Sequence, residues 1–288
     1  MKNSIFVLFA FAIVLSLQLR AVPLQQIPNP PKLVIVSDID DTIRFTRIHL
    51  RAHLFDFISG LIKQRAFTGM PALYQFLASQ GAQIEYVSGN PKSLSYFAKK
   101  FLELAGFPTG QLYDREISSE HLVDFKYRKI SELMHTQPAA QFILIGDNGE
   151  HDIEAYRRIQ MHPQLGSRVL AVYIHKLYSG PVAKKLLKDQ IPYYTAADLT
   201  AQLNLIGLTT DGVLNQVAKM QVSGMNSQFR EAKIRAIPGP LSVDSQDLQR
   251  LKRLRLAVEN PGNRDLLQSI EESLAVRSSI MCSDFFAL

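Results

Sequence analysis

The stretch LVIVSDIDDTI, at residues 33–43, decides the fold of this protein. Its first part, residues 33–36, is a continuous apolar run rich in β-branched side chains, which is typical of a strand buried on both faces of a parallel sheet. The run leads directly into Asp38, Asp40 and Asp41. Carboxylates at the end of an apolar strand repel one another and lose hydration, so they normally pair with a cation. We therefore expect a cation site there, and an Asp-rich turn or helix cap is the alternative.

Three further apolar runs resemble this first strand. The runs at residues 142–145 and 169–174 are continuous, and the run at residues 84–87 is apolar except for Glu85. Between them, apolar residues recur at helical spacing, most clearly at residues 50–62, 73–77, 94–105 and 130–134. Alternating strands and helices predict an α/β fold in which helices cover a parallel sheet. Only helical patterns continue beyond this region, which predicts a sheet domain over residues 33–208 and a helical C-terminal extension over residues 209–288.

Polar side chains gather where the other predicted strands end. Ser88 and Gly89 follow the second strand, and Asp147 and Asp152 follow the third. Lys126 begins a helix between them, where its charge opposes the helix dipole. Since ligands of open α/β sheets bind beyond the carboxyl ends of the strands, we expect these side chains to share one site with those after the first strand. Each cluster taken alone is also ordinary turn, cap or surface chemistry.

The combination of residue types indicates a site for a phosphorylated substrate and a hard cation. Carboxylates suit Mg²⁺, which takes oxygen ligands together with a substrate phosphate. Hydroxyl and ammonium donors suit the phosphate itself. A carboxylate can also be the nucleophile, and it then becomes an aspartyl-phosphate.

These motifs resemble those of the haloacid dehalogenase (HAD) superfamily of phosphotransferases. The residues that match its four ordered motifs are Asp38, Asp40 and Thr42, then Ser88, then Lys126, then Gly146 and Asp147 with Asp152. More narrowly, the strings SDIDDTI, YVSGNP and FILIGDNGEHD resemble the catalytic domain of the Mg²⁺-dependent phosphatidate phosphatases of the fungal actin-patch-protein type, which has bacterial relatives. The resemblance covers about residues 33–176 and implies a HAD-like (Rossmannoid) parallel sheet with flanking helices.

The resemblance also implies roles for individual residues. Asp38 would attack phosphorus and form the phospho-enzyme, while Asp40 would protonate the leaving alkoxide and then deprotonate the attacking water. The implied ligands of Mg²⁺ are Asp38, the backbone carbonyl of Asp40, Asp147 and, less directly, Asp152. The implied phosphate-binding residues are Ser88, Gly89, Lys126 and Thr42, of which Thr42 would fix the loop.

We expect the segment between the first two motifs to select the substrate. Its basic side chains include Arg44, Arg47 and Arg51. Positive charge there would receive an anionic lipid headgroup or lie on an anionic bilayer, and the alternative is a solvated helix face. The segment is a short insert rather than a large cap domain, so the site would admit a bulky or membrane-embedded substrate.

The N-terminus is interpreted as a secretory signal peptide over residues 1–21. Lys2 precedes an apolar run at residues 5–19, which is shorter than the roughly 20 residues that a membrane-spanning helix needs. A Pro-rich linker at residues 22–32 follows. We therefore expect an exported protein, periplasmic or secreted, and an uncleaved N-terminal membrane anchor is the alternative.

The composition argues against several other classes of protein. The net charge is +6, but the basic residues are mixed with acidic ones, which disfavours nucleic-acid binding. The single cysteine, Cys282, excludes an internal disulfide framework and a cysteine-based zinc site.

Three functions remain as hypotheses. The first is a Mg²⁺-dependent phosphatase that acts on a lipid phosphate such as phosphatidate and contacts the membrane peripherally. The second is the same chemistry on a soluble phosphomonoester or a phosphoprotein. The third is a catalytically silent module that binds a membrane or a protein partner through its basic segments. The intact set of carboxylates disfavours the third, because a binding module has no need to hold these acids together.

Overall fold

The computed structural model describes most of the predicted sheet domain. The described residues are 31–46, 66–116, 119–149, 151–176 and 183–221, together with Gln249, 252–253, 255–256, 261–265, 267–268 and Glu271. The chain divides into two units, Met1–Pro31 and Lys32–Leu288, and the sheet lies in the second. The predicted signal peptide, as well as Arg47 and Arg51 of the predicted substrate-selecting segment, lies outside the described residues.

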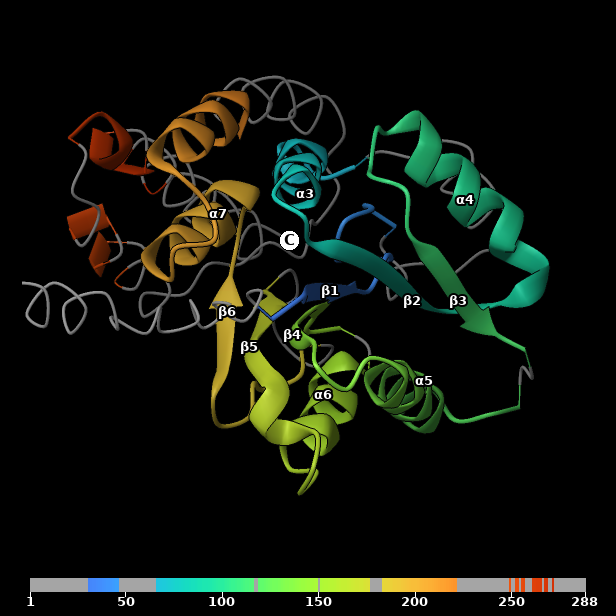
Figure 1. Ribbon diagram of the computed structural model, residues 1–288. Helices are drawn as coiled ribbons and strands as arrows, with labels where there is room; N and C mark the ends of the chain where they lie inside the picture. Colours follow the sequence, from blue (N-terminus) through green and yellow to red (C-terminus); the bar gives the residue numbers. More distant parts are fainter. Residues whose placement is uncertain are drawn as a thin grey trace, which may run out of the picture. The chain divides into compact units, whose positions relative to one another are not determined.

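The described strands form one six-stranded parallel sheet in the order β3-β2-β1-β4-β5-β6 (Figure 1). The strands are β1 Leu33–Ser37, β2 Gln83–Pro91, β3 Gln111–Arg115, β4 Gln141–Asp147, β5 Val169–His175 and β6 Gln190–Tyr193. This topology confirms the predicted α/β class. The chain adds β2 and β3 on one side of β1 and β4 to β6 on the other, so the strand order reverses between β1 and β4. The crevice at such a reversal is where open α/β sheets bind ligands.

The four apolar runs of the sequence form β1, β2, β4 and β5, whereas β3 and β6 were not predicted. These two strands are the edges of the sheet. Their sequences, QLYDR and QIPY, mix polar and apolar residues, because an edge strand is less enclosed than a central one. The strand β2 also continues beyond its predicted end, so Ser88 lies within it.

Helices cover both faces of the sheet (Figure 1). On one face lie α5 Leu122–Thr136 and α6 Asp152–Gln160, and on the other lie α3 Met70–Ser79, α4 Ser95–Leu104 and α7 Ala196–Leu205. Short 3₁₀ helices, η2 Lys92–Leu94 and η3 Gly166–Arg168, precede α4 and β5. None of the helices in the described ranges combines the length and the apolarity that crossing a membrane requires.

The central strand β1 joins two apolar cores. Ile35 belongs to the core under α3, α4 and α7, and Val34 and Val36 belong to the core under α5 and α6. All three side chains are fully buried. Successive residues of a strand point to opposite sides of the sheet, and both sides of β1 are buried. Every residue of the run must therefore be apolar, which is why it is uninterrupted in the sequence.

From residue 211 onward, the described residues of the predicted C-terminal extension are helical. They include a continuous helical stretch at residues 211–221. Leu214, Val217 and Leu267 are buried in the same apolar core as α3 and α7. The domain boundary at residue 208 stays a prediction.

His175, the last residue of β5, ties the sheet to the loop that follows β1. Its ring is buried, stacks on Tyr193 at 4.9 Å between centroids and meets Phe67 edge-on at 4.7 Å. Nδ1 lies 2.8 Å from the carbonyl oxygen of Asp41, and Nε2 lies 3.3 Å from that of Tyr194. Burial lowers the pKa of His175 below its ordinary value of 6.5 and outweighs the opposing effect of the two carbonyl groups.

We predict that His175 makes folding stability depend on pH. The folded state keeps the imidazole neutral, whereas the unfolded state takes up a proton near pH 6.5. The free energy of unfolding should therefore be highest above about pH 6.5 and fall as the pH drops toward the lower pKa of the folded state. In His175→Phe, which keeps an aromatic ring, the decrease between about pH 7.5 and about pH 5.5 should be smaller than in the wild type.

Urea unfolding followed by far-UV circular dichroism measures this effect, because the chain has no tryptophan to serve as a fluorescent probe. The exposed His135 provides the matched control, His135→Phe. A decrease of equal size in the wild type and in His175→Phe would contradict the prediction.

Candidate active site

The loop after β1 is a tight turn that fixes the first two acids of the predicted site. The Asp38 amide donates to the carbonyl of Ile145 in β4 at 2.9 Å, which holds this residue beside the end of that strand. Asp41 adopts a left-handed conformation with φ 59°. Its carboxylate accepts the backbone N–H and the hydroxyl of Thr46, both at 2.9 Å. The Asp41 carboxylate therefore shapes the turn.

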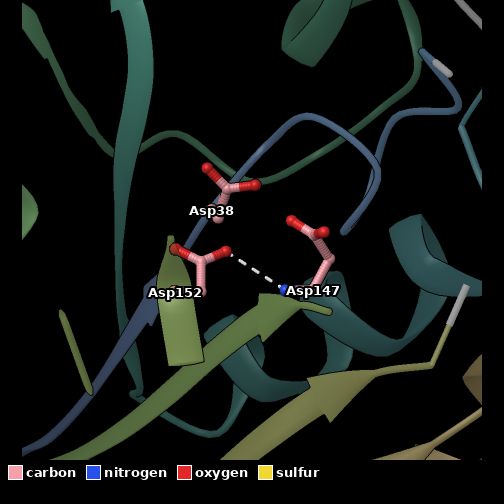
Figure 2. Close-up of side chains that lie close together, drawn as sticks. All are labelled: Asp38, Asp147 and Asp152. Atoms are coloured by element: carbon pink, nitrogen blue, oxygen red, sulfur yellow. Dashed lines mark hydrogen bonds between the residues drawn. The ribbon is translucent and has the colours of Figure 1, made fainter. Parts of the chain in front are cut away.

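Three buried carboxylates from three elements converge at the carboxyl end of the sheet. Asp38 follows β1, Asp147 ends β4 and Asp152 begins α6, and each offers an oxygen atom within 4.8 Å of the others. Figure 2 shows the three side chains lying close together. Asp152 Oδ2 also accepts the backbone N–H of Asp147 at 3.1 Å. The structure thus brings together the carboxylates that the sequence placed at separate strand ends.

Glycine at position 146 permits this close approach. A Cβ atom on Gly146 would lie 2.5 Å from Oδ2 of Asp152 and 2.6 Å from its Cβ, closer than such atoms pack. A larger residue here would therefore push α6 away from β4. The motif glycine is a packing requirement of the acid cluster.

Lys126 supplies positive charge to the cluster. Its ammonium group lies 2.9 Å from Oδ1 of Asp38 and 2.5 Å from Oδ1 of Asp152, and the side chain is fully buried on α5. The sequence alone did not distinguish this residue from a solvated lysine. Burial of the ammonium between two carboxylates makes it part of the site.

The composition of the cluster fits a hard divalent cation. Three carboxylates against one ammonium leave an excess of two formal negative charges among these four groups. Buried negative charge of this size is costly without further compensation. All the ligand atoms are oxygens, which are the ligands that Mg²⁺ and Ca²⁺ prefer.

The negative charge of the acid cluster affects the pKa values of two neighbouring tyrosines. The hydroxyl groups of Tyr74 and Ser37 share a hydrogen bond of 2.9 Å. The hydroxyl group of Tyr156 donates to the carbonyl of Ile145 at 3.1 Å. Burial raises the pKa of both tyrosines, and the negative charge of nearby carboxylates raises it further. Both phenols are therefore protonated and serve to brace β1 and β4.

Of the predicted phosphate-binding residues, Thr42 and Lys126 contact Asp38, and Ser88 and Gly89 lie on the neighbouring strand β2. Thr42 donates its hydroxyl to Oδ2 of Asp38 at 3.1 Å. Ser88 is buried near the end of β2, and its hydroxyl accepts the backbone N–H of Asn90 at 3.2 Å. Gly89 lies between them on the strand next to β1.

Arg44 is buried and paired, and its predicted role in selecting the substrate stays a prediction. Its side chain is buried, with 1% of the residue exposed, and it donates Nε and Nη2 to Oδ1 of Asp40 at 3.0 and 2.6 Å. The buried carboxylate of Asp40 requires a counter-charge, and the arginine four residues later provides it. Because the sequence shows charge but not burial, it suggested a solvent-facing side chain.

Asn90 was not predicted as a site residue. Its side-chain amide donates to Oδ2 of Asp40 at 2.5 Å, so it connects the end of β2 with the loop after β1. In the sequence, Asn90 has only the signature of a turn residue. Its partner is 50 positions away.

Comparison with known proteins places these residues in a family. The family model for "Phosphatidate phosphatase APP1, catalytic domain" matches residues 33–176, a range that includes all the acids above together with Ser88 and Lys126. Phosphatidate phosphatase APP1 of Saccharomyces cerevisiae is 28% identical over 156 residues, which cover 51% of this chain and 26% of that protein. An uncharacterized protein of Schizosaccharomyces pombe is 25% identical over 167 residues, which cover 54% of this chain and 27% of that protein. The chain thus spans about a quarter of the length of these curated relatives.

Solved structures also resemble part of this chain. A HAD family hydrolase from Deinococcus radiodurans, with bound phosphate and sodium, aligns with a TM-score of 0.43 and 12% identity over 62% of this chain and 98% of that one. The class C acid phosphatase from Bacillus anthracis aligns with a TM-score of 0.37 and 16% identity over 50% of this chain and 66% of that one.

We predict that replacing Lys126 by methionine strongly destabilises the protein. The change leaves Asp38 and Asp152 buried without the ammonium that contacts both. Breaking a buried ion pair from one side typically costs about 3–5 kcal/mol of unfolding free energy. The control is Lys129→Met on the same helix, which removes a partly exposed pair with Glu132 and should cost about 1 kcal/mol or less. Urea unfolding of both variants measures the difference, and equal losses would contradict the proposed burial of the pair.

Proposed function

The chain belongs to the family of the phosphatidate phosphatase APP1 catalytic domain, and we propose that it is a Mg²⁺-dependent phosphatase that hydrolyses a phosphomonoester through a phosphorylated aspartate. The observation that carries this proposal is the convergence of Asp38, Asp147 and Asp152 with Lys126 at the carboxyl end of the sheet. We propose a lipid phosphate such as phosphatidate as the substrate, with diacylglycerol and phosphate as products.

The surroundings of Asp38 suit a nucleophile. Thr42 and Lys126 each donate to one of its two oxygens, and its backbone is anchored to Ile145. A carboxylate held in this way presents a fixed orientation to an incoming phosphorus atom. In the first step, an oxygen of Asp38 bonds to phosphorus while the bond between phosphorus and the leaving oxygen breaks.

Asp40 is proposed as the acid and base of the reaction. Asp40 enters the first step as the protonated acid and gives this proton to the leaving oxygen, after which Arg44 faces the resulting carboxylate. In the second step it takes a proton from the water that attacks phosphorus, and the bond between Asp38 and phosphorus breaks to release phosphate. Ser88, the backbone of Gly89 and Lys126 bind the phosphoryl oxygens and stabilise their charge.

Asp38, Asp147 and Asp152, with the backbone carbonyl of Asp40, are the groups that would hold Mg²⁺. Bound there, the ion supplies positive charge that screens the repulsion between the carboxylate nucleophile and an anionic phosphate. Three buried carboxylates in one cluster support this assignment.

Two further elements of the proposal concern substrate and location. The family name supports a lipid substrate, and a soluble phosphomonoester or phosphoprotein is the alternative that the same chemistry would serve. A module that only binds a membrane or partner is disfavoured, because burying three carboxylates together is costly unless they serve a purpose.

We further propose that residues 1–21 direct export, with an N-terminal anchor as the alternative.

We predict that the phosphatase reaction depends on Asp38 and on a divalent ion. The wild-type protein should release phosphate from p-nitrophenyl phosphate in the presence of Mg²⁺, and chelation should abolish the release. Asp38→Asn should lower kcat by at least about 1,000-fold, since removing a nucleophile removes the covalent pathway. The control Asp189→Asn changes an exposed acid and should keep full activity. Activity that survives in Asp38→Asn would contradict the assigned nucleophile.

We predict that phosphatidate is a better substrate than its soluble headgroup. In mixed detergent micelles, kcat/KM for phosphatidate should exceed that for glycerol 3-phosphate by at least about 100-fold, because binding energy from the lipid part is available to the transition state. Phosphate release measured with both substrates provides the comparison. Equal values would favour the soluble phosphomonoester instead.

A further inference from the structure

The carboxylate of Asp40 lies between donors from two different elements. On one side, Nε and Nη2 of Arg44 both donate to Oδ1, at 3.0 and 2.6 Å. On the other side, the side-chain amide of Asn90 donates to Oδ2 at 2.5 Å. The two oxygens of this carboxylate therefore have different environments.

Arg44 is fixed more firmly than its place in a loop suggests. Its guanidinium lies 5.3 Å from the centre of the Phe101 ring on α4. Its backbone N–H donates to the carbonyl of Ile39 at 2.9 Å, and its own carbonyl accepts the N–H of Asp41 at 2.7 Å. The backbone of Arg44 closes the turn that carries Asp40, and its side chain holds the carboxylate of the same residue.

The geometry separates the two oxygens by function. Oδ1 receives both hydrogen bonds from the guanidinium of Arg44. The side chain of Arg44 is 2% exposed and that of Asp40 is 6% exposed, so the pair is buried. Oδ2 faces Asn90, whose backbone N–H contacts the Ser88 hydroxyl at the proposed phosphate site. Through Asn90, Oδ2 is thus the oxygen connected to Ser88.

We propose that Arg44 is a positioning residue for the phosphatase reaction: it fixes Oδ1 of Asp40 so that Oδ2 is directed toward the leaving oxygen of the substrate. This inference rests on the proposed function. The guanidinium offers two N–H groups to one oxygen, whereas a lysine offers a single ammonium, so charge alone cannot reproduce the orientation.

The test compares two substrates that need an acid to different degrees. The leaving group of p-nitrophenyl phosphate is a stable anion and needs little protonation, whereas the alkoxide of glycerol 3-phosphate needs a proton as it leaves. The quantity measured is kcat/KM, which reports on steps through the first phosphoryl transfer. Loss of a correctly oriented acid should lower kcat/KM for the alkyl ester much more than for the aryl ester.

Arg44→Met should lower kcat/KM for the alkyl ester at least about tenfold further than for the aryl ester, the same pattern as Asp40→Asn. Arg44→Lys should fall between the wild type and Arg44→Met. The matched control is Arg168→Met, since Arg168 bonds the carbonyls of Met134 and Ala140 away from the site. Its ratio of the two kcat/KM values should equal that of the wild type.

A second comparison keeps the test decisive if Arg44→Met does not fold. The double variant Asp40→Asn/Arg44→Met removes both members of the buried pair, and its ratio should match that of Asp40→Asn alone. Equal losses on both substrates in Arg44→Met and Arg44→Lys, or a further change of ratio in the double variant, would overturn the positioning role. If the wild type hydrolyses neither ester with Mg²⁺, the proposed function fails as well. If the wild type hydrolyses both esters and the Arg44 variants keep its ratio of the two kcat/KM values, only the positioning role fails.

Discussion

The ion pairs of Lys126 with Asp38 and Asp152 are the interaction on which the site depends. They join the loop after β1, the helix α5 and the start of α6 through one buried ammonium group. Carboxylates carried this far from water stay charged only if positive charge is delivered to them. The fold provides it by passing α5 between β3 and β4 in the chain and packing it against the face of the sheet where α6 lies.

A second cation solves the same problem at Asp40. Arg44 balances this acid from within the same turn, while Lys126 balances Asp38 across 88 positions of sequence. The two acids of the first motif are thus held by different partners. This separation suits the distinct roles proposed for them, since a nucleophile must reach phosphorus and an acid must reach the leaving oxygen.

Much of the fold was predictable because its central strands are enclosed on both faces. Residues 33–36 and their counterparts in β4 and β5 are apolar throughout, and those in β2 are apolar except for Glu85, so such runs are visible without a structure. The edge strands β3 and β6 were not predicted because they are only partly buried. Their sequences therefore mix polar and apolar residues and contain no continuous apolar run. The acids of the site were found because each follows a recognisable strand, although Asn90 and the pairing of Arg44 were not.

By itself the sequence determined that acids and a hydroxyl lie at the ends of the strands of a parallel sheet and that a lysine lies near the start of a helix, because apolar runs and the residues that end them are local features. Only the tertiary structure decided which of these groups meet and which are buried. Whether Lys126 is solvated or buried, and whether Arg44 is exposed or paired, depends on contacts with neighbouring elements. The order of residues along the chain does not show these contacts, and the structure shows both side chains buried. Burial is a property of the packed chain, and it is burial that turns these charges into a site.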